Sequence, residues 1–259
     1  MKTVFITGAS SGIGAALARA YAEQGATLGL LARRQEVLEE LRLSLPNAAQ
    51  HRIYAVDVTD HAALARAAHD FMQAVGQVNI VIANAGISVG TLSEFGEDIK
   101  VFDSILQTNL LATVATFSPF INGMKAYAKN SDCRLVGIGS VAGIRGLPGA
   151  GAYCASKAAV INYCESLRVE LRDSGIRVVT IAPGYIDTPM TRDNPYPMPF
   201  LMPVQAFCRA ALKSIDRADS YRVIPWQMGV VAKLLRSLPN WLYDTVFARV
   251  RRKPRASAD

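Results

Sequence analysis

The feature that most constrains this fold is the alternation between short apolar runs and longer segments of helical periodicity. Several apolar runs lack polar alternation, which is typical of strands covered on both faces of a parallel sheet. The runs expected to form strands are residues 2–6, 27–32, 51–56, 78–83, 133–139, 176–182 and 221–224. Helices are expected near residues 12–24, 34–44, 60–75, 97–129 (with a break) and 152–174. The sequence therefore predicts an α/β fold built from βαβ units.

No composition shift or long linker interrupts this alternation, so we expect one domain over residues 1–259. A hydrophobic content of 51% provides ample material for a core. The apolar runs are too short to span a bilayer, and the N-terminus lacks the apolar region of a signal peptide. These observations favour a cytoplasmic protein.

Cysteine and histidine residues give no sign of a disulfide framework or a metal site. Cys133, Cys154, Cys164 and Cys208 lie in periodic segments without CxxC spacing, so we expect buried, reduced thiols. The three histidines lie in one stretch, residues 51–69, and match no ligand spacing. No metal is therefore expected.

The stretch "VFITGASSGIG" (4–14) combines a strand, a glycine-bearing turn and the start of a helix. Gly8, Gly12 and Gly14 allow a tight turn and a close approach of the backbone to a pyrophosphate. The free N–H groups at the helix N-terminus would then bind the anion. Glycine-rich turns also occur for packing reasons, but the flanking strand and helix are the context that a dinucleotide site requires.

The second expected strand ends in "LLARR", where a dinucleotide enzyme binds the adenosine ribose. NAD-selective enzymes usually present an acid there, whereas Arg accommodates a 2′-phosphate. Ala32 stands where an acid could be, and Arg33 and Arg34 follow it. The two arginines could simply be solvated residues at a helix start, yet cations are unfavourable there without an anion. The pattern favours NADP(H) over NAD(H), with Arg33 contacting the phosphate and Arg34 near the adenine or solvated.

Three further motifs complete a recognisable set: "NAG" at 84–86, Ser140 at the end of "VGIGS", and "YCASK" at 153–157. With the glycine turn, they resemble the short-chain dehydrogenase/reductase superfamily in its compact branch, from residue 3 to about 189. The resemblance implies a Rossmann-type, doubly wound sheet of about seven mostly parallel strands with helices on both faces. It also implies a nicotinamide cofactor and a catalytic tetrad of Asn109, Ser140, Tyr153 and Lys157.

The resemblance further implies which residues hold the cofactor. These are Gly8, Ser10, Ser11, Gly12, Ile13, Gly14, Arg33, Arg34, Asp57, Val58, Asn84, Ala85, Gly86, Tyr153, Lys157, Pro183, Gly184, Ile186 and Thr188. In this pattern Asp57 contacts the adenine, Lys157 binds the nicotinamide ribose, and Asn109 holds a water that relays protons to Lys157.

Tyr153 and Lys157 are four residues apart in a helical segment, so their side chains share one face. An adjacent ammonium, together with the positive charge of an oxidised nicotinamide, would favour the phenolate and allow proton transfer. Ser140, at the end of a strand, can donate a hydrogen bond to the same substrate oxygen. A Tyr-x3-Lys pair is common on helices, and Ser140 or Asn109 could be purely structural. The catalytic interpretation depends on all the motifs occurring together.

Residues 186–215 are expected to cover the substrate, because "PYPMPFLMP" (195–203) is proline-rich yet strongly apolar. The apolar side chains are those of Met190, Met198, Phe200, Leu201 and Met202. They favour an apolar carbonyl or alcohol substrate. Packing on the core or on a second subunit is an equally good explanation.

The segment 226–259 is expected to form two short amphipathic helices broken at Pro239, followed by the basic tail "RVRRKPR" (249–255). It could cover the substrate entrance, contribute to an oligomer interface, or make a weak peripheral membrane contact with Trp226, Leu234, Leu238 and Trp241 inward. The tail would then face anionic lipid, although a solvated terminus is the simpler explanation and no nucleic-acid partner is expected. The resemblance suggests a homodimer or homotetramer through the helices near 103–129 and 152–174.

The sequence therefore predicts an NADP(H)-dependent oxidoreductase that transfers a hydride between nicotinamide and an apolar carbonyl or alcohol, with Tyr153 as general acid/base. A 3-oxoacyl-thioester reductase is the alternative enzyme, although the long C-terminal segment departs from the common tetrameric reductases. A non-catalytic NADPH-binding sensor or scaffold is the alternative of a different class. The complete tetrad argues against it.

Overall fold

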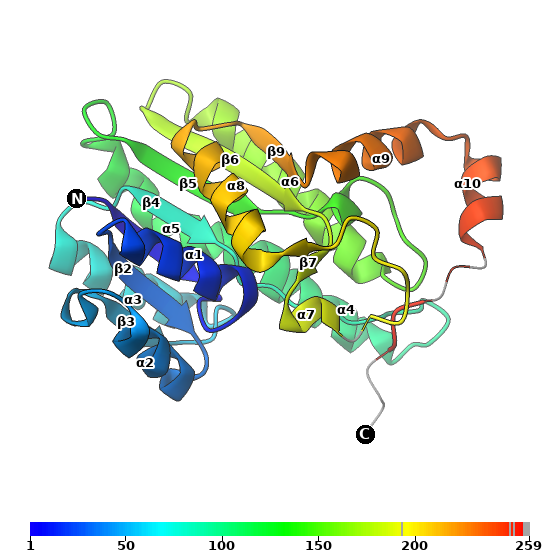
Figure 1. The fold of residues 1–259 in the computed structure, drawn as a ribbon, viewed down its shortest axis with the longest axis horizontal. Helices are drawn as coiled ribbons and strands as arrows, with labels where there is room; N and C mark the ends of the chain where they lie inside the picture. Colours follow the sequence, from blue (N-terminus) through cyan, green and yellow to red (C-terminus); the bar gives the residue numbers. More distant parts are fainter. Residues whose placement is uncertain (193, 249, 251, 256–259) are drawn as a thin grey trace.

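Seven parallel strands form the central sheet, in the order β3-β2-β1-β4-β5-β6-β9 (Figure 1). The computed structural model describes residues 1–192, 194–248, 250 and 252–255. The strands are β1 (Thr3–Thr7), β2 (Thr27–Ala32), β3 (Arg52–Ala55), β4 (Ile80–Ala83), β5 (Cys133–Ile138), β6 (Ile176–Pro183) and β9 (Tyr221–Ile224). All seven predicted strands are present, and the predicted Rossmann-type fold class is confirmed.

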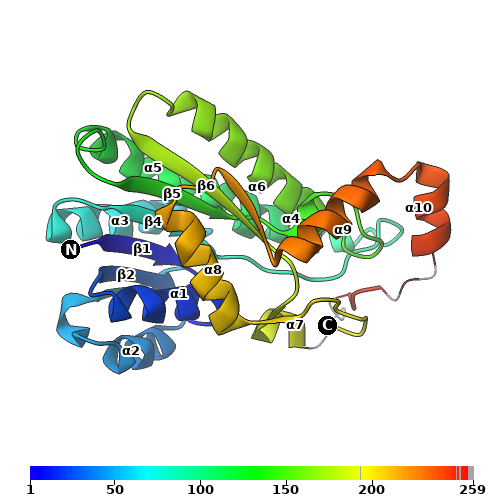
Figure 2. The same cartoon turned by 45° about the horizontal axis from the view of Figure 1, so that its top comes forward.

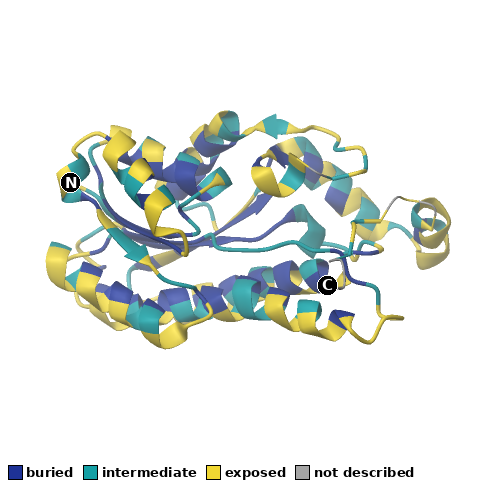
Figure 3. Cartoon of the chain, turned by 90° about the horizontal axis from the view of Figure 1, so that it is seen from below, coloured by how far each residue is buried: buried dark blue, intermediate teal, exposed yellow. Residues whose placement is uncertain are grey.

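Helices cover both faces of the sheet, which appears edge-on as a buried layer between them (Figure 3). One face carries α1 (Gly12–Glu23), α2 (Gln35–Ser44) and α8 (Val204–Asp216), whose apolar residues share a core cluster with the sheet. The other face carries α3 (His61–Val75), α5 (Ala112–Lys125) and α6 (Gly151–Glu170). The shorter α4 (Asp98–Leu106) packs against α6. Two burial faces explain why the five inner strands are mostly apolar, whereas the edge strands β3 and β9 are partly exposed.

The strand order reverses at β1, which pairs with β2 on one side and with β4 on the other. Val4 is in register with Leu28 of β2 and with Ile80 of β4. In open α/β sheets, ligands bind beyond the carboxyl ends of the strands at such a switch point. The topology therefore places a candidate site after Thr7 and Ala83.

Two parts of the chain fold differently from the sequence prediction. The expected break within 97–129 is a single π-helical turn, Gln107–Leu111, which joins α4 to α5 without interrupting the helical path. Residues 204–215 of the expected substrate cover (186–215) form most of α8. Phe207, Ala211 and Ile215 of this helix are fully buried in the core against the sheet and α1.

The remaining cover segment, residues 186–203, contains β7 (Ile186–Asp187), the short helix α7 (Pro189–Arg192) and β8 (Met202–Pro203). β7 and β8 pair in a small parallel sheet that closes the base of this segment. Residue 193 lies outside the described residues. Short 3₁₀ turns, Ala48–Gln50 and Val141–Gly143, complete the described elements.

The C-terminal segment forms α9 (Trp226–Ser237) and α10 (Asn240–Phe247), which are separated at Pro239 as expected. Figures 1 and 2 both show α10 at the end of an arm that extends away from the sheet. Residues 249, 251 and 256–259 of the predicted extension lie outside the described residues. No helix among the described residues is long and apolar enough to span a membrane.

Candidate active site

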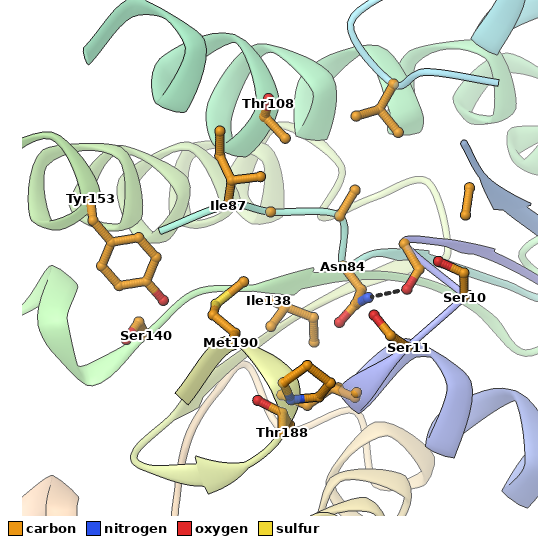
Figure 4. A pocket seen from close by; sticks show the side chains of 18 of the residues that line it. Ser10, Ser11, Asn84, Ile87, Thr108, Ile138, Ser140, Tyr153, Thr188 and Met190 are labelled. Atoms are coloured by element: carbon orange, nitrogen blue, oxygen red, sulfur yellow. Dashed lines mark hydrogen bonds between the residues drawn. The ribbon is translucent and has the colours of Figure 1, made fainter. Parts of the chain in front are cut away.

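A cleft of about 750 Å³ lies beyond the carboxyl ends of the strands (Figure 4). It is lined by nearly all the residues predicted to bind cofactor or act in catalysis: Gly8, Ser10, Ser11, Gly12, Ile13, Arg33, Arg34, Asp57, Val58, Asn84, Ala85, Gly86, Ser140, Tyr153, Lys157, Pro183, Gly184, Ile186 and Thr188. Gly14 and Asn109 do not line it; they lie behind its wall. The cleft therefore joins the glycine turn at one end to the Ser-Tyr-Lys group at the other.

The turn between β1 and α1 is a tight turn that requires glycine at three positions. Gly8 and Gly12 have positive φ angles of 66° and 53°, which side chains rarely adopt. A Cβ at Gly8 would lie 2.8 Å from Ala85 Cα, and one at Gly14 would overlap the carbonyl oxygen of Gly8. The turn thus brings the backbone against the "NAG" segment and leaves the first N–H groups of α1 at the cleft.

Asn84 holds the two halves of this turn together. Its side-chain nitrogen donates hydrogen bonds to the carbonyl oxygens of Thr7 and Gly8, at 3.0 and 3.2 Å. Its backbone N–H donates to the Thr7 hydroxyl at 3.1 Å. The end of β4 is therefore fixed to the end of β1.

The two arginines after β2 make different contacts at the adenosine end of the cleft. The Arg33 guanidinium is 73% exposed and lies 3.8 Å from the Asp57 carboxylate. Arg34 instead donates a hydrogen bond to the Ser10 hydroxyl in the glycine turn, at 3.2 Å. Arg33 is therefore free to turn toward a phosphate, whereas Arg34 is already attached to the pyrophosphate loop.

Asp57 is held as a carboxylate by its own turn. Burial raises the pKa of Asp57, but hydrogen bonds from the Thr59 N–H and hydroxyl and the charge of Arg33 outweigh it, so the net pKa is lowered. The charge attracts Arg33, while the contact of Asp57 with an adenine stays a prediction.

Tyr153 and Ser140 meet at the other end of the cleft, where their hydroxyl groups point toward one another (Figure 4). Burial raises the pKa of Tyr153, while a hydrogen bond with Ser140 opposes this. The Ser140 hydroxyl also caps the turn at Val141–Gly143 by accepting from the Ala142 N–H at 3.1 Å. The cap fixes the Ser140 side chain at the end of β5.

Lys157 lies one helical turn after Tyr153 and is only 5% exposed. Its ammonium donates to the carbonyl oxygen of Ile138 at 2.8 Å, and burial lowers its pKa to about 8. The ammonium is 5.9 Å from the centre of the Tyr153 ring. Burial disfavours the charged forms of both groups, so the lowering of the Tyr153 pKa expected from Lys157 and an oxidised nicotinamide together stays a prediction.

Asn109 lies in the π-helical turn and is completely buried. Its side-chain oxygen accepts from the Ile87 N–H at 2.8 Å, and its nitrogen donates to the Ile87 carbonyl and the Ser156 hydroxyl. The side chain thus clamps the segment after "NAG" to α6. The structure shows this clamp, while the water-relay role remains a prediction.

Several lining residues were not predicted: Thr59, Ile87, Asp103, Ser104, Gln107, Thr108, Ile138, Gly139, Pro189, Met190 as a cleft residue, and Thr191. Most flank a motif by one to three residues. Their proximity to Asp57, "NAG", Ser140 or Thr188 was the only available signal. Asp103 and Ser104 of α4 had no such signal, because no predicted motif lies within three residues of them.

Two solved structures have folds similar to that of this chain. A 3-ketoacyl-(acyl-carrier-protein) reductase from Brucella melitensis in complex with NADH superimposes with a TM-score of 0.77 at 25% identity, covering 86% of this chain and 96% of the other. An alcohol dehydrogenase from Thermococcus sibiricus in complex with 5-hydroxy-NADP gives 0.76 at 25% identity, with the same coverage.

Sequence comparison points to the same family. An oxidoreductase of Myxococcus xanthus, described as uncharacterized, is 36% identical over 252 residues, covering 96% of this chain and 98% of its own. The mouse dehydrogenase/reductase SDR family member 7B is 34% identical over 191 residues, covering 71% of this chain and 58% of its own. Residues 2–197 match the family described as short chain dehydrogenase. The chain belongs to the short-chain dehydrogenase family and is an oxidoreductase with a nicotinamide-dinucleotide site.

Proposed function

We propose that the protein is an NADP(H)-dependent oxidoreductase that interconverts an apolar carbonyl compound and its alcohol. The observation that carries this proposal is the single cleft that joins the glycine turn and Arg33 to Ser140, Tyr153 and Lys157. A nicotinamide cofactor bound along this cleft would supply or accept the hydride. The chain's own residues would bind the substrate oxygen and move its proton.

Tyr153 is the proposed general acid in the direction of reduction. Its raised pKa keeps the phenol protonated at neutral pH, as a proton donor to a carbonyl oxygen requires. Ser140 donates a hydrogen bond to the same oxygen and shares its developing charge. Lys157 is proposed to bind the nicotinamide ribose, and positive charge added beside Tyr153 would favour the phenolate in the direction of oxidation.

Preference for NADP(H) is proposed from Arg33. Its guanidinium is exposed at the adenosine end and engaged only at 3.8 Å by Asp57 among the described residues. A 2′-phosphate offers two or more oxygens to the planar guanidinium, a stronger pairing than the one with Asp57.

An apolar substrate is proposed from the residues around Tyr153 and after Pro183. Met190 lines the cleft beside the Ser140–Tyr153 pair (Figure 4). Phe200 and Leu201 of the remaining cover segment are about half exposed, at 50% and 46%, and so are available to contact an apolar molecule. A 3-oxoacyl-thioester reductase is the second candidate, favoured by the Brucella melitensis neighbour. A panel of medium-chain aldehydes, ketosteroids and acyl-thioester mimics distinguishes the two candidate functions, with turnover of each compound measured as NADPH oxidation.

Replacing Tyr153 by Phe tests the reaction. The variant keeps the ring but loses the proton donor, so we expect kcat to fall by about 10²–10⁴-fold. NADPH affinity, measured by fluorescence titration, should change less than about twofold because the phenol is not proposed to bind the nucleotide strongly. A Tyr153→Phe enzyme with the kcat of the wild type on a true substrate would contradict the proposed mechanism, and binding without turnover by the wild type on the whole panel would favour the sensor alternative.

Replacing Arg33 by Asp tests the choice of cofactor. Loss of the guanidinium and gain of a carboxylate should lower kcat/KM with NADPH by about 10–100-fold, equivalent to 1–3 kcal/mol. The value with NADH should stay the same or rise. Arg66→Asp, an exposed residue of α3 outside the cleft, makes the same charge change and should leave both values unaltered. If Arg33→Asp kept the wild-type ratio of kcat/KM with NADPH to kcat/KM with NADH, the assignment of Arg33 to the 2′-phosphate would be wrong.

A homodimer or homotetramer is proposed from the family, with the α4–α5 and α6 surfaces as the contact. Ile99, Leu111 and Val169 are exposed on these helices at 67%, 41% and 61%. Sedimentation velocity at two protein concentrations tests the proposal.

A further inference from the structure

The described part of the C-terminal tail, residues 252–255, lies on the body of the protein. Arg255 donates hydrogen bonds to both carboxylate oxygens of Asp98 at 2.8–3.1 Å and to Glu97 at 2.9 Å. Its guanidinium also lies 3.6 Å from the centre of the Phe95 ring. The sequence left open whether the basic tail is solvated or faces an anionic partner. For Arg255 the anionic partner is the chain's own Glu97 and Asp98 at the start of α4.

The tail forms the outermost of three adjacent extended segments. Gly90 donates its N–H to the Pro254 carbonyl at 3.0 Å and bridges Arg255. On its other side the same loop continues inward, because the Thr91 N–H donates to the Gly149 carbonyl at 3.1 Å and Thr91 bridges Ala150. Glycine at 90 is required, since a Cβ there would overlap the carbonyl oxygens of the tail. The loop 88–92 is thus held between the tail and the start of α6.

Both of the inner segments lead directly to the reacting end of the cleft. Ser88, which accepts a hydrogen bond from the Lys253 ammonium at 2.8 Å, follows Ile87 of the cleft wall. Ala150 precedes α6, whose third residue is Tyr153. Figures 1 and 2 show the tail returning from α10 toward the part of the molecule that carries α4 and α7. The tail therefore braces two segments that each lie within three residues, along the chain, of a residue that lines the cleft: Ile87 before one and Tyr153 after the other.

We propose that residues 252–255 form the outer wall of the acceptor pocket, with Arg255 as the positioning residue that holds the loop 88–98 in place. The proposal rests on the proposed function, since it concerns the acceptor of that same reaction. It assigns acceptor specificity to a segment that follows the sheet by thirty residues. The carboxylate of Asp98 fixes the position of this wall, because it is buried and accepts hydrogen bonds from Arg255 and from the Leu92 N–H at 2.7 Å. A charge-assisted, bidentate pair to a buried carboxylate holds its geometry better than an exposed surface pair.

The first test is independent of turnover. Hydrogen exchange of the Gly90 amide is measured in the full-length wild type, in Arg255→Gln and in Arg252→Gln. Arg252 is an exposed residue of the same tail, so its variant removes the same charge without touching the Asp98 pair. We expect exchange at Gly90 to accelerate about tenfold in Arg255→Gln, because the Pro254 carbonyl is released, and to stay unchanged in Arg252→Gln.

The second test uses two acceptors of different size, propanal and decanal, with NADPH. In Arg255→Gln we expect KM for decanal to rise about tenfold, equivalent to about 1.4 kcal/mol, with kcat and the dissociation constant of NADPH changed less than twofold. KM for propanal should not change, since it does not reach the wall. A protein that ends at residue 251 should behave like Arg255→Gln.

The outcomes separate this inference from the proposed function. Equal KM values for decanal in the wild type, Arg255→Gln and the shortened protein would overturn the wall, as would unchanged exchange at Gly90. A parallel loss of kcat for both aldehydes would also overturn it, because that result indicates general distortion of α6. Absence of turnover by the wild type with every carbonyl would instead count against the proposed function, and the exchange experiment would still report on the tail.

Discussion

Burial controls the charge of the two groups proposed to do the chemistry. Lys157 has a pKa of about 8, against an ordinary value of 10.5, because its ammonium is enclosed by protein. Tyr153 is shifted in the opposite direction, above 10.0, also by burial. Both groups are therefore more easily neutral than they would be in water, which suits a site where a proton is passed at neutral pH.

The shift at Lys157 predicts how stability depends on pH. Its pKa is lower in the folded protein, so between pH 8 and 10.5 the unfolded chain binds more protons and stability rises with pH. Below pH 8 the lysine is charged in both states, and the cost of burying the charge is fully present. In Lys157→Met this contribution is absent. The free energy of unfolding of the wild type minus that of Lys157→Met should therefore increase with pH in this window, by up to about 1.4 kcal/mol per pH unit.

Urea unfolding of the cofactor-free proteins at pH 7.5, 8.5 and 9.5 measures that difference. Other titrating groups are the same in both proteins and cancel. Tyr153 titrates only at higher pH. Its pKa is raised in the folded protein, so above pH 10 the native state binds more protons than the unfolded state and stability falls as the pH rises. A difference that stays constant from pH 7.5 to 9.5 would show that the Lys157 ammonium is not shifted.

At the scale of single residues, motif positions were predictable and their contacts were not. Residues that follow buried strands, such as Ser140 and Asn84, were expected at one edge of the sheet because parallel strands end there, and both line the cleft. The link from Arg34 to Ser10 depends on side-chain rotamers and has no signature in the sequence. The clamp made by Asn109 depends on a π-helical turn, which hydrophobic periodicity cannot reveal.

The strand–turn–helix element at the start of the chain predicts a second measurable effect. A methyl group at Gly14 would overlap the Gly8 carbonyl and lie 2.6 Å from the Asn84 side-chain nitrogen. Gly14→Ala must therefore push α1 away from β1. We expect a loss of about 1–3 kcal/mol of stability and at least tenfold weaker NADPH binding, measured by thermal unfolding and fluorescence titration.

Gly123→Ala provides the matched control for that element. Gly123 lies inside α5, where an added methyl group would make an ordinary 3.5 Å contact with the Met72 sulfur. Alanine is the better helix former, so stability should rise by up to about 1 kcal/mol with cofactor binding unaltered. Similar behaviour of the two variants would mean that the turn tolerates a side chain and is not a close-fitting cradle.

Elements were predictable wherever one strong pattern dominated. All seven strands of the central sheet lie within a few residues of their apolar runs. Burial on both faces explains such runs in the five inner strands, whereas the edge strands β3 and β9 are mostly exposed or half-buried. The sequence analysis does not predict α8, because the prolines of 195–203 favour a loop and the expected cover continues to residue 215. Its buried residues Phe207, Ala211 and Ile215 do follow helical spacing.

At the scale of the whole molecule, the C-terminal arm is rigidly attached and yet apolar on its outer side. Arg145 donates hydrogen bonds to the carbonyl of Leu238 at 2.9 Å and to Asn240, and lies 3.9 Å from the centre of the Tyr243 ring. Trp226 and Leu234 of α9 are 64% exposed, and Trp241 of α10 is 70% exposed. Outward aromatic and apolar residues are typical of segments that bind at membrane interfaces, so we predict that this arm contacts lipid.

The charges on α9 favour a lipid surface as the partner of this face. Lys233 and Arg236 are its only ionisable residues, and both are exposed. Val230 lies between Trp226 and Leu234 on the same exposed stripe, at a spacing of four residues. An apolar stripe flanked only by cations matches the headgroup region of an anionic bilayer. Since Arg255 is bound to Asp98, this contact would depend on the arm and not on that end of the tail.

Weak, salt-sensitive binding of the full-length protein to vesicles that contain phosphatidylserine is therefore predicted. The triple variant Trp226→Ser, Leu234→Ser, Trp241→Ser removes most of the outward apolar surface of the arm. The fraction of this variant that pellets with the vesicles should fall to that of a vesicle-free sample. Leu43→Ser, which changes a residue of α2 that is 63% exposed, should pellet like the wild type. Equal pelleting of the wild type and the triple variant would exclude the arm as the contact. The stripe would then be available to a second copy of the chain, which sedimentation velocity of the same triple variant would reveal as a loss of self-association.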